Sequence, residues 1–114
     1  MNKFPKLKKL FVYGKLKPEY DKSDKLFDPK KDEVHGDLYS FNHDAEAKDF
    51  NKSKSDIDGY LTEASPKTIK TLDKIEAPQY KRVPITTESG KKAEAYEYER
   101  KLPKTATKIR NWKK

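Results

Sequence analysis

Ile57-Asp58-Gly59-Tyr60-Leu61-Thr62 repeats the pattern of Val34-His35-Gly36-Asp37-Leu38-Tyr39: a β-branched residue, a glycine two positions later and a leucine two positions after that. In a strand, where side chains alternate between the two faces, these three residues share one face. A glycine on the inward face of a strand marks a bend or the close approach of another backbone. The repeat therefore predicts two strands of a tightly curved sheet, such as a small barrel. The alternative is a chance match between two short segments.

The residues before and between these segments have weaker patterns. Lys9-Leu10-Phe11-Val12-Tyr13 is apolar at successive positions, which is typical of a strand buried on both faces. The following residues, 14–18, are predicted as a turn. Residues 19–32 are mostly charged, and we predict a loop with at most one helical turn. Residues 42–56 are polar, and we predict a second loop that holds a short helix at residues 44–47.

A helix start signal follows. Ser65 is a good N-cap residue, and Pro66 suits the first helical position. Because proline disfavours a helical residue ahead of it, the helix should stop before Pro78. We therefore predict a helix over residues 66–77.

The residues after this helix are typical of a hairpin. Residues 80–87 are predicted as a strand, in which Pro84 indicates an edge position or a bulge. Ser89-Gly90 is predicted as the hairpin turn, and residues 92–99 as the returning strand.

Composition limits the classes of protein to consider. The 114 residues are 32% hydrophobic and 40% charged, which predicts a single domain over residues 1–114 with a small core. There is no cysteine, so disulfides, thiolate zinc sites and cysteine nucleophiles are excluded. The basic N-terminus precedes no signal-type apolar run, and no segment approaches the roughly 20 apolar residues that cross a bilayer. We expect a cytoplasmic protein with no membrane partner.

The net charge of +8 lies at the two ends of the chain. Residues 1–9 hold four lysines and residues 100–114 hold seven Lys and Arg, neither with an acid, which leaves −3 for residues 10–99. We predict a basic C-terminal tail from about residue 100, with Ile109 and Trp112 as docking points and few core residues. A basic groove through the fold is not indicated, so nucleic acid is an unlikely partner, although the tails could touch an acidic one.

Glu76 has an unusual place in the predicted helix. At about 100° per residue, with Ile69 at zero, Leu72 lies near 300° and Glu76 near 340°. Glu76 thus falls between two apolar residues on the face that should be buried, where an unpaired carboxylate is costly. It is therefore a candidate general base, whose pKa burial would raise. The alternatives are that the last turn frays and exposes Glu76, or that it pairs with Lys81 or Arg82.

Taken in order, these segments resemble the γ-glutamylcyclotransferase-like (AIG2-like) family over roughly residues 9–99. The resemblance is carried by an opening strand with a Tyr-Gly-(Ser/Thr)-Leu loop, two glycine-containing strands, a Leu-Asp-x-x-Glu-Gly…Tyr-x-Arg signature and a late strand. In this chain they correspond to Phe11-Val12-Tyr13-Gly14-Lys15-Leu16, Val34-x-Gly36-x-Leu38, Ile57-x-Gly59-x-Leu61, Leu72-Asp73-x-x-Glu76 with Tyr80-x-Arg82, and Ala93-x-Ala95-Tyr96-x-Tyr98.

The resemblance implies an α+β fold, a small antiparallel barrel of about six strands flanked by short helices. It also implies an enzyme that releases 5-oxoproline from a γ-glutamyl peptide or amine, with Glu76 as general base and no metal or cofactor. Because the attacking amine belongs to the substrate itself, orientation supplies most of the catalysis. The implied substrate-binding residues are Tyr13, Gly14, Lys15, Leu16, Tyr80, Arg82 and Tyr96. We expect Glu76 to point inward beneath the backbone of residues 14–16, with Tyr13, Tyr80 or Tyr96 along the wall.

Two positions depart from the family pattern. Lys15 stands at the Ser/Thr position, and Ala77 replaces the glycine after the glutamate. A lysine at the mouth of the pocket could recognise an extra negative charge. The alternative function is therefore a pocket protein that binds, sequesters or degrades a small anionic or nucleotide-like ligand. A third is binding of nucleic acid or an acidic partner through the basic ends.

Other sites are not supported by the sequence. His35 and His43 are the two histidines, and Asp37 and Asp44 do not complete metal-ligand spacing around them. There is no glycine-rich phosphate loop and no nucleophile elbow. We predict no metal site, and His35 is predicted to lie on the surface of the sheet.

Overall fold

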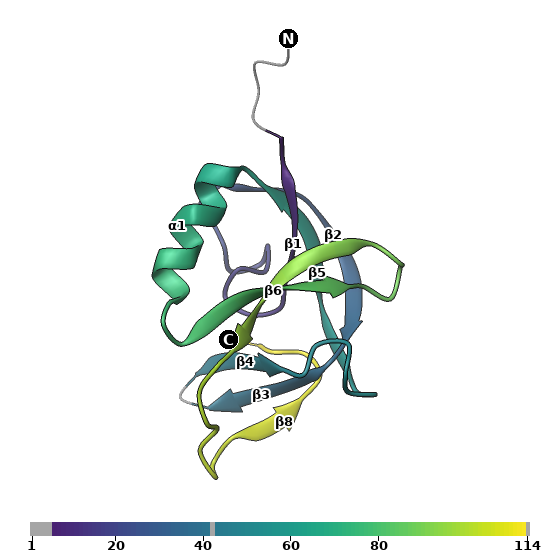
Figure 1. Ribbon diagram of the computed structural model, residues 1–114, viewed down its shortest axis with the longest axis vertical. Coiled ribbons are helices and arrows are strands. Elements are labelled where there is room, and N and C mark those ends of the chain that lie inside the picture. The colour runs from purple at the N-terminus through teal and green to yellow at the C-terminus, as the bar shows by residue number, and fades with distance from the viewer. Residues whose placement is uncertain (1–5, 42, 114) are drawn as a thin grey trace.

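The computed structural model describes residues 6–41 and 43–113 as two sheets and a helix (Figure 1). One sheet has five strands in the order β2-β5-β1-β7-β6, and the other has three in the order β4-β3-β8. The elements are β1 (Lys8–Val12), β2 (Leu26–His35), β3 (Asp37–Phe41), β4 (Asp44–Lys48), β5 (Asp56–Ala64), α1 (Pro66–Glu76), β6 (Tyr80–Thr86), β7 (Lys92–Tyr98) and β8 (Thr107–Ile109).

The α+β class is confirmed, and the barrel is corrected in one respect. The two sheets do not close into a single barrel, and α1 is the one helix of the described residues, rather than one of several. The sheets separate at Gly36, which lies between β2 and β3, so the chain leaves the larger sheet there and β3 pairs with β4 and β8. Residues 34–39 are therefore two strands, rather than one.

The two glycines of the repeated pattern have different steric roles. At Gly36, a Cβ atom would lie 2.9 Å from Cδ1 of Ile57. At Gly59, within β5, a Cβ atom would lie 2.3 Å from the carbonyl oxygen of Val12 on the neighbouring strand. The first glycine is at the predicted bend, and the second is at a close approach between two backbones.

The central strand β1 is buried on both faces, as its apolar run predicts. It pairs with β5 on one side and with β7 on the other. Phe11 packs into a core shared by both sheets, whereas Leu10 and Val12 pack with Ile69 of α1. The end of β1 therefore delivers the following loop to the space between α1 and the smaller sheet.

Two segments that the sequence predicts as loops contain strands. β2 begins at Leu26, within the segment predicted as loop, and its charged residues lie exposed at the edge of the larger sheet. Charged side chains on an edge strand hinder pairing with other chains, so this composition suits the position. Residues 44–47 belong to β4, which pairs with β3, and do not form a helix.

The helix and hairpin lie where the sequence predicts them. Ser65 caps α1, and its hydroxyl accepts a hydrogen bond of 3.2 Å from the N–H of Thr68. β6 is an edge strand, as Pro84 indicates, and pairs with β7 across a turn in which Gly90 has a φ of 85°.

The C-terminal residues are part of the fold, contrary to the expectation of few core residues there. β8 pairs with β3, and Trp112 is only 2% exposed. The buried ammonium of Lys17 donates to the Trp112 carbonyl oxygen at 2.6 Å. Ile109 and Trp112 are both packed against the core, as expected of docking points. Residues 1–5 of the basic N-terminal segment, and Lys114, lie outside the described residues.

The part of the chain that the structure describes contains no helix with the length and apolar character needed to cross a membrane.

Candidate functional site

A cavity of about 380 Å³ lies between the end of α1, the loop after β1 and the start of β4. It brings together segments that are far apart in the sequence. Its lining residues are Phe11, Val12, Tyr13, Gly14, Lys15, Leu16, Asp44, Ala45, Leu72, Ile75, Glu76, Gln79, Tyr80 and Tyr96. All the predicted site residues except Arg82 therefore lie on one wall or another of the same cavity.

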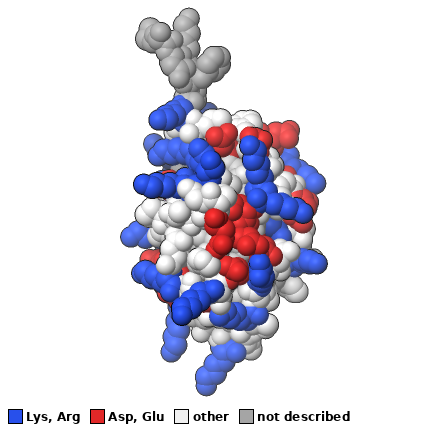
Figure 2. All heavy atoms as spheres, turned by 90° about the vertical axis from the view of Figure 1, so that its right-hand side faces the viewer, with Lys and Arg blue, Asp and Glu red and all other residues white. Residues whose placement is uncertain are grey.

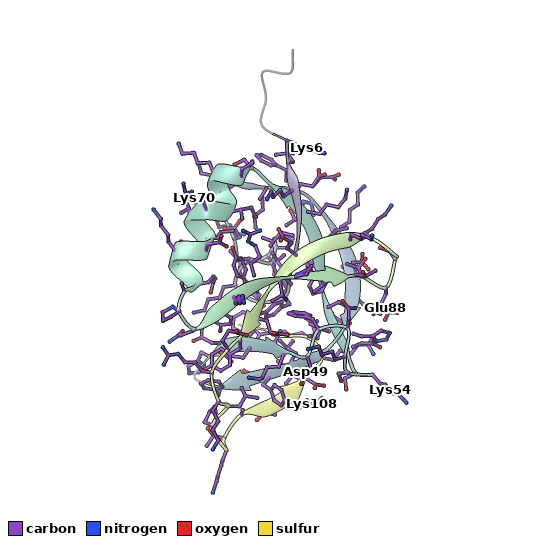
Figure 3. All side chains as sticks on the ribbon, viewed as in Figure 1. Lys6, Asp49, Lys54, Lys70, Glu88 and Lys108 are labelled. Carbon is purple, nitrogen blue, oxygen red and sulfur yellow. The ribbon has the colours of Figure 1, made fainter. Side chains whose placement is uncertain are left out.

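Glu76 is the last residue of α1 and lines this cavity. Ile69 on the same helical face is buried, whereas Lys70 projects from the outward side of α1 (Figure 3). Burial raises the pKa of the Glu76 carboxyl, the charge of Asp44 raises it further, and the charge of Lys15 lowers it. Within the described residues, no side chain forms a hydrogen bond or ion pair with the Glu76 carboxylate. Its carboxylate is thus available to a ligand.

Neither structural alternative for Glu76 is observed. Arg82 pairs with Asp73 and Glu94, and not with Glu76. The helix continues to Glu76, which is partly buried, so the last turn does not expose it fully.

The loop of residues 13–16 forms the opposite wall. The N–H of Lys17 donates to the carbonyl oxygen of Gly14 at 3.0 Å, which closes a turn with Lys15 and Leu16 at its centre. The backbone N–H groups of these two central residues have no acceptor among the described residues. The loop therefore offers two unused donors beside the cavity, which is the arrangement that binds carbonyl or carboxylate oxygens.

Lys15 extends from this loop to the rim. Its ammonium lies 2.7 Å from a carboxylate oxygen of Asp44, and its side chain is 64% exposed. The loop itself is packed closely against β4, because a Cβ atom on Gly14 would lie 3.1 Å from the Cβ of Ala45. A glycine at this position allows the loop to approach β4.

Tyr13, Tyr80 and Tyr96 also line the cavity, and each hydroxyl is held by a protein acceptor. Tyr13 donates to the carbonyl oxygen of Tyr96, and Tyr96 donates to Asp73 at 2.8 Å. The Tyr80 hydroxyl lies 2.9 Å from Oε1 of Glu46 and 3.1 Å from a backbone carbonyl oxygen of β4. Burial is the main cause that raises the pKa of all three hydroxyls, so they are neutral at physiological pH.

Arg82 does not line the cavity. Its guanidinium donates two hydrogen bonds to the Asp73 carboxylate, at 3.0 and 3.1 Å, and a further one to Glu94. Asp73 in turn accepts from the Tyr96 hydroxyl, which is on the cavity wall. The structure thus places Arg82 one layer behind the cavity, where it holds Asp73 rather than a substrate.

Three residues near the cavity were not anticipated from the sequence: Asp44, Gln79 and Glu46. Asp44 and Gln79 line it, whereas Glu46 is 2% exposed behind Tyr80. Burial raises the pKa of the Glu46 carboxyl to about 7, although the hydrogen bond from Tyr80 acts to lower this pKa. The only sequence signal was an acid between two alanines in a segment predicted as loop.

Other clusters lie away from this cavity. His35 lies between Asp56 and Glu88, with its ring nitrogens 3.0 and 2.7 Å from their carboxylate oxygens, and these three residues could hold a metal ion. Glu88 is in the turn of the β6–β7 hairpin (Figure 3).

A larger cavity of about 500 Å³ opens over β2 and β5. On this side of the molecule, acidic side chains gather in a patch with Lys and Arg around it (Figure 2). The carboxylates of the patch have protein partners: Arg110 pairs with Glu33 at 2.8 Å and with Asp58 at 2.9 Å, and Ser89 donates to Asp32 at 2.6 Å.

The model of the family described as gamma-glutamyl cyclotransferase, AIG2-like, matches residues 10–114. This chain belongs to that family. The match extends beyond the segments whose motifs resemble the family and includes β8 and Trp112. No curated protein sequence is significantly similar to the chain.

Solved structures have the same fold. An AIG2-like protein from Mus musculus superposes with a TM-score of 0.76 at 14% identity, over 94% of this chain and 88% of that one. A uropathogenic E. coli-specific protein superposes with a TM-score of 0.73 at 15% identity, over 92% of this chain and 89% of that one. An uncharacterized protein from Pyrococcus horikoshii superposes with a TM-score of 0.69 at 23% identity, over 90% of this chain and 86% of that one. At these identities the likeness shows the fold alone.

Proposed function

We propose that this protein is a γ-glutamylcyclotransferase that releases 5-oxoproline from a γ-glutamyl peptide or amine, with Glu76 as the general base. The observation that carries the proposal is the Glu76 carboxylate, which has no partner in the described protein and shares its cavity with the unused N–H groups of Lys15 and Leu16. Membership of the family supports the class of reaction. A cytoplasmic location stays a prediction from the sequence.

The reaction needs few groups. Glu76 accepts a proton from the α-ammonium group of the substrate, and the freed amine attacks the γ-carbonyl carbon of the same molecule. A C–N bond forms as the five-membered ring closes, and the bond from the γ-carbon to the leaving nitrogen breaks. The proton held by Glu76 passes to the leaving nitrogen. The ring nitrogen still carries one proton too many after the attack, and Glu76 transfers this second proton to the leaving nitrogen in the same way, so the amine departs as an ammonium ion and the enzyme returns to its starting state. Orientation is the main task of the cavity, because nucleophile and electrophile are already tethered.

The two walls suit the two ends of a γ-glutamyl group. The N–H groups of Lys15 and Leu16 can donate to its carbonyl or carboxylate oxygens. Glu76 and Asp44 offer carboxylates to its ammonium group. The raised pKa of Glu76 makes it a stronger base than an exposed glutamate, while leaving it able to ionise as the pH rises.

A second candidate is a pocket protein that binds, sequesters or degrades a small anionic or nucleotide-like ligand. The observation in its favour is Lys15, whose exposed ammonium lies at the rim of the cavity. However, Asp44 already pairs with this ammonium, and Glu76 adds a further negative charge. A polyanion such as a nucleotide would meet a net negative site, so we rank this candidate second.

The test is 5-oxoproline release from a panel of γ-glutamyl peptides and amines, with wild type compared with Glu76→Gln. The substitution keeps the shape of the side chain and removes the base, so we expect kcat/KM to fall by about two to four orders of magnitude. Glu99→Gln, at an exposed glutamate outside the cavity lining, is the matched control and should leave the rate unchanged. Unchanged turnover in Glu76→Gln would remove Glu76 from the mechanism. Anion binding that is lost in Lys15→Ala, without 5-oxoproline, would favour the second candidate.

A further inference from the structure

Glu46 is a buried carboxyl group that the proposed chemistry does not use. It lies on β4 with 2% of its surface exposed. Its Oε1 atom accepts from the Tyr80 hydroxyl at 2.9 Å, whereas its Oε2 atom is buried and has no hydrogen-bond partner among the described residues. A buried polar atom without a partner costs about 1–3 kcal/mol, and more when it is charged, so its presence calls for a functional reason.

The Tyr80 hydroxyl links Glu46 to the cavity. Tyr80 lines the cavity, and its hydroxyl carries a single hydrogen. Among residues 6–41 and 43–113, the two groups within hydrogen-bond distance of it are acceptors on β4: Glu46 at 2.9 Å and the Ala45 carbonyl oxygen at 3.1 Å. The hydrogen is therefore directed to β4, and what remains for a ligand is a lone pair of the Tyr80 oxygen.

We propose that Glu46 is a positioning residue that, acting through Tyr80, fixes the Tyr80 oxygen as a hydrogen-bond acceptor and thereby selects substrates that carry an α-ammonium group. The inference rests on the proposed function, because it assigns the α-ammonium group of a γ-glutamyl substrate to the Tyr80 oxygen. Hydrogen bonds to a charged acceptor are stronger than those to a neutral one, so ionised Glu46 holds the hydroxyl more firmly than a backbone carbonyl could.

Ionisation of Glu46 sets the direction of this hydrogen bond. Burial raises its pKa to about 7, with Asp44 raising it and the Tyr80 hydrogen bond and Lys15 lowering it. When Glu46 is protonated, its O–H can donate to the Tyr80 oxygen and occupy the lone pair that an ammonium group needs. The titratable groups facing Glu46 are Tyr13 and Lys15 beside β1, Tyr39 opposite it on β3, Asp44 on β4 and Tyr80 on β6.

The first experiment uses the ligand-free protein. We expect the ring resonances of Tyr80, assigned by their loss in Tyr80→Phe, to titrate with a midpoint near pH 7 in wild type. The titration should disappear in Glu46→Gln, which keeps the shape and removes the ionisation. Tyr80 resonances that do not change with pH in wild type, or that titrate alike in Glu46→Gln, would overturn the inference without any reference to activity.

The second experiment measures selectivity in the Glu76→Gln background, where substrate is bound and not consumed. The ligands are γ-glutamyl-alanine and glutaryl-alanine, which differ only in the α-amino group. At about pH 8.5 we expect γ-glutamyl-alanine to bind about tenfold more tightly, a difference of about 1.4 kcal/mol. Adding Glu46→Leu or Tyr80→Phe should abolish this preference and leave the affinity for glutaryl-alanine unchanged. Combining both should do no more than either alone, because the two residues act through one hydrogen bond.

A control variant and steady-state kinetics distinguish the proposed positioning role of Glu46 from a purely structural one. Thr62→Val removes another buried polar side chain, whose hydroxyl donates to the Phe27 carbonyl oxygen at 2.7 Å, away from the cavity. It should lower the melting temperature and keep the ligand preference. With Glu76 intact, Glu46→Leu should raise KM about tenfold with kcat within a factor of about three, whereas a loss of folded protein would lower apparent kcat at constant KM.

The outcomes distinguish this inference from the function on which it rests. An intact preference for γ-glutamyl-alanine in Glu46→Leu, in a protein that releases 5-oxoproline, would overturn the inference alone. Failure of both ligands to bind, in a protein without activity, would overturn the proposed function and the inference with it. A preference that weakens in the Glu76→Gln protein as the pH falls to about 6, and that no longer changes with pH once Glu46→Gln is added, would support the inference.

Discussion

Two charged neighbours shift the proton affinity of Glu76 in opposite directions. After burial, which is the largest cause of its raised pKa, Asp44 raises the pKa and Lys15 lowers it. Because a general base must be deprotonated, activity should fall as the pH drops through this pKa. The charged pair at the rim of the cavity therefore adjusts the pH range of the reaction.

Lys15→Met should raise the pKa of Glu76 and move the acid limb of the kcat/KM profile to higher pH by about 0.5–1 unit, because a cation that favours the ionised form is lost. Asp44→Asn should move the limb to lower pH. The double variant should lie near wild type, since the two charges are 2.7 Å apart and their effects oppose each other. Lys70→Met, on the outward side of α1, is the control. Identical acid limbs in wild type, Lys15→Met and Asp44→Asn would contradict the assignment of this limb to Glu76.

Glu46 makes stability depend on pH in the opposite sense to a paired carboxylate. Its pKa is raised from an ordinary 4.5 to about 7, so between these values the folded protein binds more protons than the unfolded chain. The free energy of unfolding should therefore decrease as the pH rises from about 4.5 to about 7, by up to about 3 kcal/mol. Glu46→Gln should lack this decrease and Glu99→Gln should keep it, as urea unfolding at a series of pH values would show. Parallel curves for wild type and Glu46→Gln would contradict the prediction.

Which residues of the site could be predicted from the sequence depended on the local pattern around each residue. Glu76 could be singled out because it interrupts an apolar helical face, and the structure places it at a cavity together with the predicted loop of residues 13–16. Its catalytic role stays a prediction. Glu46 could not be found in this way, because it is buried where β4 pairs with β3, and the sequence predicted a short helix instead of a strand at residues 44–47.

At the scale of elements, local signals placed α1 and the β6–β7 hairpin to within one residue or so. Ser65, Pro66 and Pro78 act on the backbone of their immediate neighbours, so their effect is readable without the rest of the fold. β2 and β4 lack such signals. β2 is a charged edge strand, and its pairing with β5 outweighs its own weak preference.

The contact between β5 and β1 depends on Gly59. A Cβ atom there would lie 2.3 Å from the Val12 carbonyl oxygen and 2.7 Å from the ring of Phe11, so Gly59→Ala must push the two strands apart. We expect a loss of roughly 2–4 kcal/mol in the free energy of unfolding, measured by chemical denaturation. Gly90→Ala is the control, since nothing lies within 4 Å and only its φ of 85° opposes the substitution. It should cost about 1 kcal/mol, and an equal or larger cost there would contradict the steric explanation for Gly59.

At the scale of the whole molecule, the number of sheets depends on pairings between distant segments. The repeated glycine pattern predicted a tightly curved sheet, and the glycines do lie at a bend and at a close backbone approach. Whether such a sheet closes is decided by where β3 and β8 find partners, and β8 lies about seventy residues after β3 in a segment predicted as a tail. No local pattern carries that information.

The C-terminal residues complete the smaller sheet, so their removal should affect the whole fold. Trp112 is 2% exposed, packs edge-on against Tyr20 at 5.5 Å between ring centroids, and its carbonyl oxygen accepts from buried Lys17. Deleting residues 104–114 removes β8 and Trp112, and leaves the buried Lys17 ammonium without the Trp112 carbonyl oxygen as its acceptor. An unpaired buried charge and an empty tryptophan site each cost about 3–5 kcal/mol, which is comparable to the stability of a small domain.

We therefore expect the protein truncated after Pro103 to lose cooperative thermal unfolding, followed by circular dichroism. Trp112→Ala should be folded but less stable by about 3–5 kcal/mol. A chain that ends at Lys113 is the control, because it keeps the Trp112 peptide carbonyl, lacks only the terminal lysine and should unfold within about 0.5 kcal/mol of the full chain. A truncated protein that melts like the full chain would show that β8 is peripheral. In that case any nucleic-acid binding by the basic C-terminus could be tested by deletion alone, whereas a truncated protein that unfolds requires charge-neutral substitutions at Lys101 and Lys104 instead.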